Sequence, residues 1–385
     1  MKKVRVAQIV TRMDWAGSPD IIRIICASLK QDGYDVKLIT GPTKNFSAGT
    51  KNFLEEFKND IIVIPWLRRE ANLFLDSLSL MKLYLILLKE KFDIVHTHTA
   101  KAGALGRVAA YLAGCRRIVH MPHGHNFYGY FSPFISMLVK RLERFLARFT
   151  DGFVALSDLE KEDLLKFGIA EDKRIRVVPS GMNLQFKGID RVEALRKKEE
   201  LGFRLDERIV GMVSRLEEVK GPEYFIEAAE MVARRTEGVR FLVAGEGSLR
   251  RKLENRVKEL GLGDTVIFTG WRDDALEIIS FLDILVQPSL NEAVGRVLLE
   301  AQGLGIPVVA TKVGGIAEVV KEDVTGILVP SRDTEELADA ICGLLEDEGK
   351  MSSMSKSARK WVDEKFSVEM MLKEINSVYK EVSRI

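Results

Sequence analysis

Short runs rich in valine and isoleucine alternate along this chain with segments of helical periodicity. The runs are almost continuously apolar, which is typical of strands buried on both faces, and the amphipathic segments between them suit helices that cover a parallel sheet. The predicted strands of the first half are Val4–Val10, Val36–Thr40, Ile61–Ile64, Ile94–His98, Ile118–Met121, Phe153–Leu156 and Arg176–Val178. The predicted helices include Asp20–Lys30, Leu73–Lys89, Ala102–Ala113 and Leu159–Phe167.

The alternation stops at Pro179–Lys187 and resumes after a charged helix at Arg191–Leu201. The second set of predicted strands is Ile209–Val213, Phe241–Ala244, Val266–Thr269, Ile284–Gln287, Val308–Ala310 and Ile327–Val329. The pattern predicts an α/β protein with two Rossmann-like, doubly wound domains, which suits a length of 385 residues. We expect these domains at residues 1–182 and 183–365, followed by a helix over 366–385.

Composition excludes several classes of protein. The 58 basic and 56 acidic residues leave a net charge of +2, so no broad basic field indicates a nucleic-acid partner. Three distant cysteines exclude a disulfide framework and a Cys-x-x-Cys zinc knuckle, and they favour a reducing compartment. The start MKKVRVAQIV lacks the long apolar segment and cleavage site of a secretion signal, so we expect a cytoplasmic protein.

Ligands of open parallel sheets bind where the strands end and the next helices begin. The first such loop, TRMDWAGSPD, places Gly17 before a helix whose free N–H groups can receive an anion. The loop is neither GxGxxG nor a Walker motif, which disfavours dinucleotide binding and nucleotide hydrolysis.

All five histidines lie between positions 96 and 125. His96 and His98 are two residues apart on a predicted strand, so they point to the same face. A zinc site is one interpretation, but no cysteine ligand or HExxH motif accompanies them, so a structural role is favoured for His96, His98 and His120. His123 follows a strand, and we expect it to donate a hydrogen bond to a substrate hydroxyl or phosphate.

Two loops of the second half carry charge. Arg215 and Lys220 lie between a strand and a helix, where paired cations suit a diphosphate. Glu292 precedes another helix, and Glu300 lies eight residues later, so the two carboxylates fall within about a quadrant of each other around the axis. One suits a sugar and the other a ribose diol, and Gly295 lets the backbone amides between them approach a phosphate.

These motifs resemble a known family. The Glu-x7-Glu segment, GIPVVAT, GGIAEVV and SRLEEVKG are similar to the donor half of family-4 retaining glycosyltransferases with the GT-B fold. DWAGSPD, HTHTAKAGALGR, PHGHNF and VVPSGMN resemble the acceptor half, so the resemblance covers almost the whole chain. It implies two Rossmann-like domains facing across a cleft, a nucleotide-sugar donor, a C-terminal helix that returns to the N-terminal domain, and a role in bacterial cell-envelope polysaccharide or glycolipid synthesis.

The resemblance also implies residue roles in the donor half. Arg215 and Lys220 match the cations that hold the diphosphate, and Glu300 matches the carboxylate that binds the ribose. Glu292 matches the carboxylate at the hydroxyls of the transferred sugar. The donor-binding segment continues through Ala293, Val294 and Gly295.

In the acceptor half, Gly17 matches the glycine loop that closes on the phosphates, and His123 the histidine beside the reacting sugar. Ala16 and Ala293 stand where relatives often have glycine, and the departure near Glu292 bears on sugar specificity. Arg296 is either an additional cation in the cleft or a solvent-facing side chain. The loop FTGWRDD near Trp271 is expected to meet the base, with UDP as the default nucleotide.

The chain contains no Asp-x-Asp motif, so we expect no metal or other cofactor and assign the neutralisation of the leaving diphosphate to Arg215 and Lys220. The family is assigned a same-face transfer with retention to a saccharide or lipid-linked acceptor. The alternatives are a GT-B-type epimerase or phosphorylase, and a non-catalytic sugar-nucleotide-binding protein. A phosphorylase would need a pyridoxal-phosphate lysine, and a pure binder is disfavoured because Arg215, Lys220 and Glu292 are all present.

The segment Pro133–Phe149 has an apolar stripe at helical spacing and four cations largely opposite it. An aromatic cluster, Phe127, Tyr128, Tyr130 and Phe131, precedes it. We expect the stripe to be buried against the sheet, while the aromatic residues and the cations Lys140, Arg141, Arg144 and Arg148 meet anionic headgroups. This predicts peripheral association with the inner face of the cytoplasmic membrane.

Overall fold

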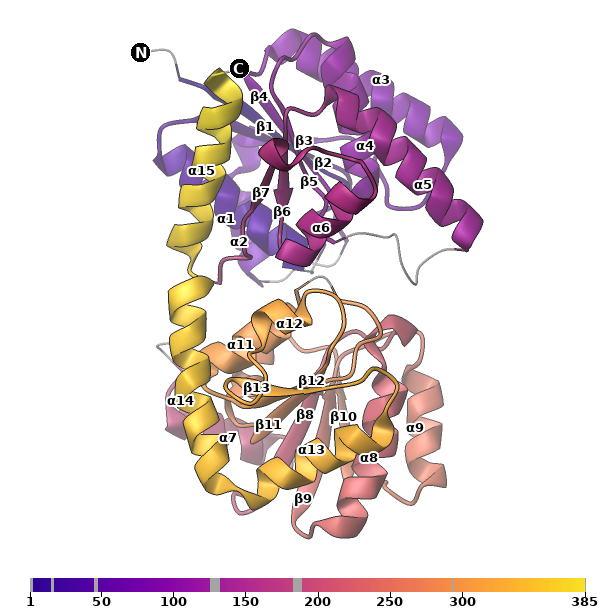
Figure 1. Cartoon of the computed structure of the whole chain (residues 1–385), viewed down its shortest axis with the longest axis vertical. Helices are drawn as coiled ribbons and strands as arrows, with labels where there is room; N and C mark the ends of the chain where they lie inside the picture. Colours follow the sequence, from indigo (N-terminus) through magenta and orange to yellow (C-terminus); the bar gives the residue numbers. More distant parts are fainter. Residues whose placement is uncertain are drawn as a thin grey trace. The chain divides into compact units, whose positions relative to one another are not determined.

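A computed structural model describes residues 3–14, 17–44, 48–124, 132–182, 189–292 and 294–384. The chain divides into two compact units (Figure 1). The N-terminal unit comprises Met1–Gly181 together with Val368–Ile385, and the C-terminal unit comprises Met182–Ser367. Each unit contains one parallel sheet with helices packed on it, which confirms the predicted α/β fold of two Rossmann-like domains.

The N-terminal unit is built on a seven-stranded parallel sheet in the order β3-β2-β1-β4-β5-β6-β7. Its strands are β1 (Arg5–Val10), β2 (Asp35–Thr40), β3 (Ile61–Val63), β4 (Ile94–His98), β5 (Ile118–Met121), β6 (Gly152–Ala155) and β7 (Ile175–Val177). All seven correspond to predicted strands. The central strand β1 pairs with β2 and β4, so that Val6 is in register with Val36 and Ile94.

The helices of this unit are α1 (Gly17–Gln31), α2 (Ala48–Glu56), α3 (Leu73–Glu90), α4 (Ala100–Leu112), α5 (Pro133–Leu146), α6 (Asp158–Lys166) and α15 (Val368–Arg384). Helix α1 begins at Gly17, three residues before the predicted start at Asp20. Helix α2 was not predicted, because its sequence AGTKNFLEE is short and lacks an extended apolar stripe.

The last helix, α15, belongs to the N-terminal unit, as predicted for the C-terminal helix. It contacts α1 and β6 (Figure 1). Its side chains Met371, Ile375 and Tyr379 are almost completely buried. The final segment of the chain therefore completes the core of the first unit.

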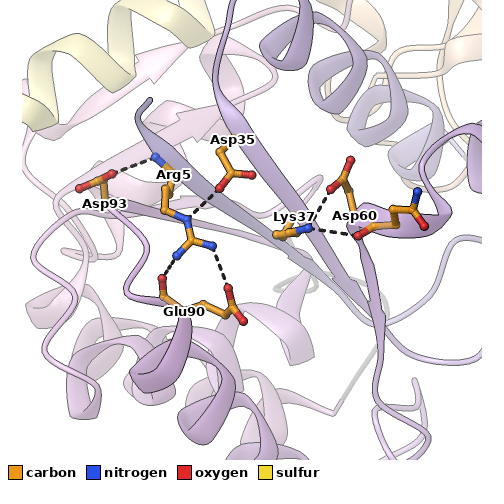
Figure 2. Close-up of polar contacts among 7 residues, drawn as sticks. Arg5, Asp35, Lys37, Asp60, Glu90 and Asp93 are labelled. Carbon is orange, nitrogen blue, oxygen red and sulfur yellow. Dashed lines mark hydrogen bonds and ion pairs between the residues drawn. The ribbon is translucent and has the colours of Figure 1, made fainter. Parts of the chain in front are cut away.

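Ion pairs hold the edge of this sheet at which the strands begin, called here the amino edge. Arg5 on β1 donates from Nε to Asp35 (2.8 Å) and from Nη2 to Glu90 (2.7 Å), and Lys37 on β2 contacts Asp60 at 2.8 Å (Figure 2). Burial alone would raise the pKa of Asp60, but hydrogen bonds from two lysines, one of them Lys37, lower it. The charged groups of the amino edge thus neutralise one another.

An aspartate immediately before a strand recurs in both units and binds the start of the neighbouring strand. Asp93, Asp151 and Asp283 precede β4, β6 and β11 (Ile284–Gln287). Their carboxylates accept from backbone N–H groups on β1, β5 and β8 (Arg208–Val213), namely those of Arg5 (2.9 Å), Ile118 (2.7 Å) and Ile209 (2.7 Å). Each bond satisfies an N–H group at a strand start, where the sheet ladder offers no partner.

The C-terminal unit contains a six-stranded parallel sheet in the order β10-β9-β8-β11-β12-β13. Besides β8 and β11, its strands are β9 (Val239–Ala244), β10 (Val266–Gly270), β12 (Val308–Thr311) and β13 (Gly326–Val329), and all six were predicted. Its helices are α7 (Arg191–Glu200), α8 (Pro222–Arg235), α9 (Arg250–Glu259), α10 (Ala275–Ser280), α11 (Arg296–Leu304), α12 (Ile316–Val319), α13 (Thr334–Glu346) and α14 (Glu348–Lys365).

No helix in the described part of either unit combines the length and apolar character needed to cross a membrane.

Candidate active site

The opposite edge of the N-terminal sheet, where the strands end, carries a hydrogen-bonded histidine cluster. His98 closes β4, and its Nε2 lies 2.7 Å from Oε1 of Gln8 on β1. Its Nδ1 lies 2.9 Å from Nε2 of His123, which follows β5. Three elements separate in sequence therefore position one histidine at the carboxyl edge.

Helix α15 completes this cluster from the end of the chain. The Nε2 group of Gln8 donates to the hydroxyl of Tyr379 at 2.8 Å, and the same hydroxyl lies 2.8 Å from Nδ1 of His96. Gln8, His96, His98 and Tyr379 are all buried. As predicted, His96 and His98 point to the same face, and their ring centroids are 4.3 Å apart.

Burial keeps the histidines of this cluster uncharged. It lowers the pKa of His96 and of His123 to about 3, and it places the pKa of His98 and His120 well below the usual value. All four rings are therefore neutral near pH 7 and hold one donor and one acceptor nitrogen each. In the described part of the chain, no three histidine, cysteine or acidic side chains are grouped in a way that could hold a metal ion.

His120 has the structural role that the sequence favoured. Its Nδ1 lies 2.9 Å from the hydroxyl of Thr97, and its ring packs against α4 at Gly103. A Cβ at Gly103 would lie 2.3 Å from that ring, so only glycine permits this approach.

The backbone at His123 has a φ of +60°, which is unusual for a residue other than glycine. The loop is held by the buried carboxylate of Glu160 on α6, which accepts from the N–H of Gly124 (2.9 Å) and from that of Leu156. Sequence analysis did not single out Glu160. The sequence feature that could have identified it is the capping-box spacing Ser157-x-x-Glu160. Ser157 does cap α6, but the Glu160 carboxylate holds the His123 loop.

Gly17 is the first residue of α1, the helix that follows β1. The free N–H groups of this helix terminus suit an anion. Ala16, which precedes it, lies outside the described residues, as do Ala293 and the aromatic cluster at 127–131.

In the C-terminal unit, two distant predicted site residues lie in direct contact. Lys220 closes the short 3-10 helix η5 (Glu218–Lys220), and its Nζ forms an ion pair with Oε2 of Glu292, which follows β11. Gly221, with a φ of +63°, makes this approach possible, because a Cβ there would lie 2.0 Å from the carbonyl oxygen of Pro288. Arg215, after β8, is exposed and forms no ion pair with any described residue.

The loop after β12 packs against the backbone of Glu292. The N–H of Gly315 donates to the Glu292 carbonyl oxygen at 3.0 Å, and a Cβ at Gly314 would lie 1.9 Å from that oxygen. Gly295, with a φ of +72°, precedes the first residue of α11, and Val294 beside it is buried. The glycines of two loops thus fix the backbone of Glu292 close to the start of α11.

Glu300 lies on α11 one turn after Arg296, and the two form an ion pair of 3.9 Å. The Arg296 side chain is partly buried, and its role in donor binding stays a prediction. The neighbouring Leu298 and Ala301 are fully buried.

Sequence analysis missed a further loop of this site, the segment AGEGS after β9. Gly245 and Gly247 let it approach the loop after β8, because Cβ atoms there would lie 1.8 Å from the Ser214 carbonyl oxygen and 2.3 Å from that of Leu216. The Ser248 hydroxyl also donates to Glu217 at 2.7 Å. The available signal was a Gly-x-Gly pair directly after a predicted strand.

Comparison with known proteins agrees with this arrangement. Residues 17–186 match the family model described as Glycosyltransferase Family 4, and residues 194–361 match Glycosyl transferases group 1. The chain is 32% identical over 320 residues, 82% of each protein, to the UDP-Gal:alpha-D-GlcNAc-diphosphoundecaprenol alpha-1,3-galactosyltransferase of Escherichia coli. It is 27% identical to the capsular polysaccharide biosynthesis glycosyltransferase CapM of Staphylococcus aureus, over 91% of both chains.

The fold is also that of a solved structure, Anabaena Alr3699/HepE in complex with UDP and glucose. The TM-score is 0.82 at 23% identity, and the match covers 98% of this chain and 100% of the other. The family models, the identity to the E. coli enzyme and this likeness in fold agree with the motifs at the carboxyl edges of both sheets. The chain is therefore a glycosyltransferase and belongs to the family-4 glycosyltransferases of the GT-B fold.

Proposed function

We propose that this glycosyltransferase transfers a hexose, with retention, from a UDP-sugar to a lipid-linked saccharide acceptor in cell-envelope polysaccharide synthesis. The observation that carries the proposal is the Lys220–Glu292 pair, together with the exposed Arg215 in the same loop after β8. This group offers cations for a diphosphate and a carboxylate for sugar hydroxyls within one set of loops. The names of the E. coli and S. aureus relatives support the donor and the class of acceptor.

In the proposed reaction, the acceptor oxygen forms a bond to the anomeric carbon on the face from which UDP departs. The bond between that carbon and the diphosphate oxygen breaks, and the proton of the acceptor hydroxyl passes to the departing diphosphate. Arg215, Lys220 and the N-terminal amides of α11 stabilise the developing negative charge. His123 lies beside the transferred sugar, and Glu300 binds the ribose.

We propose that this charge stabilisation needs no metal ion, because Arg215, Lys220 and helix N-terminal amides can supply the positive charge that an ion would provide. The test measures sugar transfer by the purified enzyme in EDTA and then after addition of Mn²⁺ or Mg²⁺. Unchanged activity in EDTA is the expected result. Activity lost in EDTA and restored by either ion would contradict metal independence while leaving the donor site intact.

Donor and stereochemistry are tested together. A thermal-shift panel of UDP-, GDP-, dTDP- and ADP-sugars identifies the donor, and NMR of the product formed on a lipid diphosphate-linked sugar gives its anomeric configuration. We expect stabilisation by a UDP-hexose and an α-linked product from an α-linked donor. An inverted product would reject retention. If the protein binds the donor but neither transfers the sugar nor slowly hydrolyses the donor, a non-catalytic binding protein would be favoured instead.

The acceptor proposal is supported by helix α5. Its apolar stripe was expected to pack against the sheet, and the structure corrects this: Phe134, Leu142 and Phe145 are 65%, 48% and 49% exposed. The inward face is instead formed by Ser136, Glu143 and other residues at helical spacing. The orientation of α5 is set by a buried ion pair between Arg107 and Glu143.

Arg107 on α4 is fully buried and donates to both carboxylate oxygens of Glu143 on α5, at 2.9 and 2.8 Å. Its desolvation is costly unless this carboxylate faces inward. The pair therefore sets the rotation of α5 and leaves the apolar stripe in solvent. An exposed apolar stripe flanked by exposed Arg141 and Arg148 suits the interface of an anionic membrane.

We propose that α5 binds the membrane that carries the lipid-linked acceptor, on its cytoplasmic face. The test is flotation with vesicles of neutral lipid or of neutral lipid with anionic phosphatidylglycerol. Leu138→Gln with Leu142→Gln should abolish flotation, and Arg141→Glu with Arg148→Glu should abolish only its dependence on anionic lipid. The matched control is Val192→Gln, which changes an exposed apolar residue of the other unit. Failure of the wild type to float at low salt would reject the proposal.

A further inference from the structure

A continuous chain of buried hydrogen bonds links His123 to the C-terminal helix. Its members are His123, His98, Gln8, Tyr379 and His96, and the successive contacts measure 2.9, 2.7, 2.8 and 2.8 Å. Each contact needs one donor and one acceptor, so the proton positions along the chain are not independent.

The Gln8 amide sets the direction of the chain. Its oxygen faces His98 and can only accept, so the proton of His98 lies on Nε2. The ring is neutral, which leaves Nδ1 of His98 as an acceptor toward His123. His123 must therefore donate from Nε2.

The same logic applies beyond Gln8. Its NH2 group donates to the hydroxyl of Tyr379, whose own proton is then directed to Nδ1 of His96. Burial raises the pKa of Tyr379, so this proton stays in place across the working range of pH. Every contact in the chain then runs in one direction, from His123 to His96.

One nitrogen is left over at the start of the chain. Nδ1 of His123 is buried and has no hydrogen-bond partner among the described residues. With the ring proton on Nε2, this nitrogen holds an unshared electron pair. It can accept a proton or hydrogen bond, and it cannot donate one.

We infer that Gln8, His98 and Tyr379 are positioning residues that hold His123 as the Nε2–H tautomer and so present its Nδ1 as an acceptor to a sugar hydroxyl. This replaces the sequence expectation that His123 donates to a hydroxyl or phosphate. The inference rests on the proposed function only in naming the sugar as the partner. It makes a residue of the last helix responsible for the chemical character of an active-site side chain.

The tautomer is measured without turnover. Long-range ¹H–¹⁵N correlation spectra of the ¹⁵N-histidine-labelled full chain distinguish Nδ1–H from Nε2–H rings, and His123→Gln assigns the signal. We expect Nε2–H at His123 in the wild type, and a mixture of both forms in Tyr379→Phe. A wild-type ring protonated on Nδ1 would overturn the inference whether or not the enzyme transfers a hexose.

Kinetics provide the second measurement. Tyr379→Phe keeps the buried ring but removes the hydroxyl, so the Gln8 amide loses the contact that orients it. We expect kcat to fall about tenfold, the size of effect expected when one oriented hydrogen bond to the substrate is weakened, with an unchanged KM for the donor. Tyr34→Phe is the matched control, because Tyr34 packs edge-on against Tyr379 at 6.4 Å without joining the hydrogen-bond chain. Equal kcat values for Tyr379→Phe, Tyr34→Phe and the wild type would overturn the positioning role.

Discussion

The two edges of the N-terminal sheet use polar groups in opposite ways. At the amino edge, Arg5 and Lys37 meet carboxylates, and the charges neutralise one another (Figure 2). At the carboxyl edge, neutral histidines share one directed chain of hydrogen bonds, and Thr99 and His123 adopt positive φ angles of 63° and 60°. Such backbone positions cost on the order of 1–3 kcal/mol each. One edge stabilises the sheet, and the other is maintained at a cost in stability because it carries the site.

The largest expected effect is the response of the carboxyl edge to acid. His96 and His123 have a folded pKa of about 3 against an ordinary value of 6.5, so the unfolded chain binds protons first as the pH falls. The free energy of unfolding should therefore decrease from about pH 6.5 down to about pH 3, by about 1.4 kcal/mol per pH unit for each such histidine.

The C-terminal unit is the internal control for this titration, because all histidines lie between positions 96 and 125. Hydrogen exchange at pH 7, 6 and 5, corrected for intrinsic rates, should show protection falling in β4 and β5 well before β8 and β9. Equal loss of protection in both units would contradict the histidine origin of the effect.

The second prediction extends the comparison to the other sheet. Lys220→Ala should weaken UDP binding by about 10- to 100-fold, since a charged hydrogen bond contributes about 1.5–3 kcal/mol and no core volume is removed. Calorimetric titration with UDP measures the effect. Lys252→Ala, which breaks the surface pair with Glu223 in the same unit, should bind UDP as the wild type does. Wild-type affinity in Lys220→Ala would reject this residue as a diphosphate ligand.

Glu300→Ala should have a somewhat smaller effect, about 1–3 kcal/mol, and should weaken UDP and UDP-sugar alike, because the ribose is common to both. Glu254→Ala is the matched control, since Glu254 also pairs with an arginine one turn earlier on a helix, Arg250. Calorimetric titration of each variant with UDP and with UDP-sugar measures the two affinities. A loss seen only with UDP-sugar would assign the sugar to Glu300 and the ribose to Glu292.

The smallest effect is expected at the amino edge. Arg5→Met should lower the free energy of unfolding by about 0.5–2 kcal/mol, since each of its two partly exposed ion pairs contributes at most about 1 kcal/mol. It should leave kcat unchanged, because these pairs are distant from the carboxyl ends of the strands. Arg204→Met, which removes an exposed pair with Asp206, should change stability by less. Urea unfolding and steady-state kinetics are compared for both. A fall in kcat with Arg5→Met would remove the functional distinction between the two edges.

How much of the fold and of the candidate site could be predicted depends on how far apart in the sequence the interacting residues lie. The strands and the placement of Gly17, Arg215 and Gly295 follow from local periodicity and from the rule that parallel-sheet sites lie at strand ends. The contact of Lys220 with Glu292 joins residues 72 positions apart, and no local pattern specifies it.

The Gln8–Tyr379 contact and the orientation of α5 could not be predicted from the sequence, because both depend on tertiary contacts. Gln8 was not singled out from the sequence, although it is a polar residue within a predicted buried strand, and its partner Tyr379 lies 371 positions away. Periodicity identified the apolar stripe of α5 but could not say which face packs inward. The buried Arg107–Glu143 pair decides that, and its energy depends on a tertiary environment that a helical pattern does not contain.

The return of α15 to the first unit has a consequence for synthesis. Ile375 and Tyr379 fill the interior of the N-terminal unit, yet the ribosome makes them after the whole of Met182–Ser367. During translation the second unit can therefore finish folding while the first still lacks a helix. The hydrogen bonds that direct His123 form only when Tyr379 has left the exit tunnel, so a nascent chain has no ordered acceptor histidine until α15 has emerged.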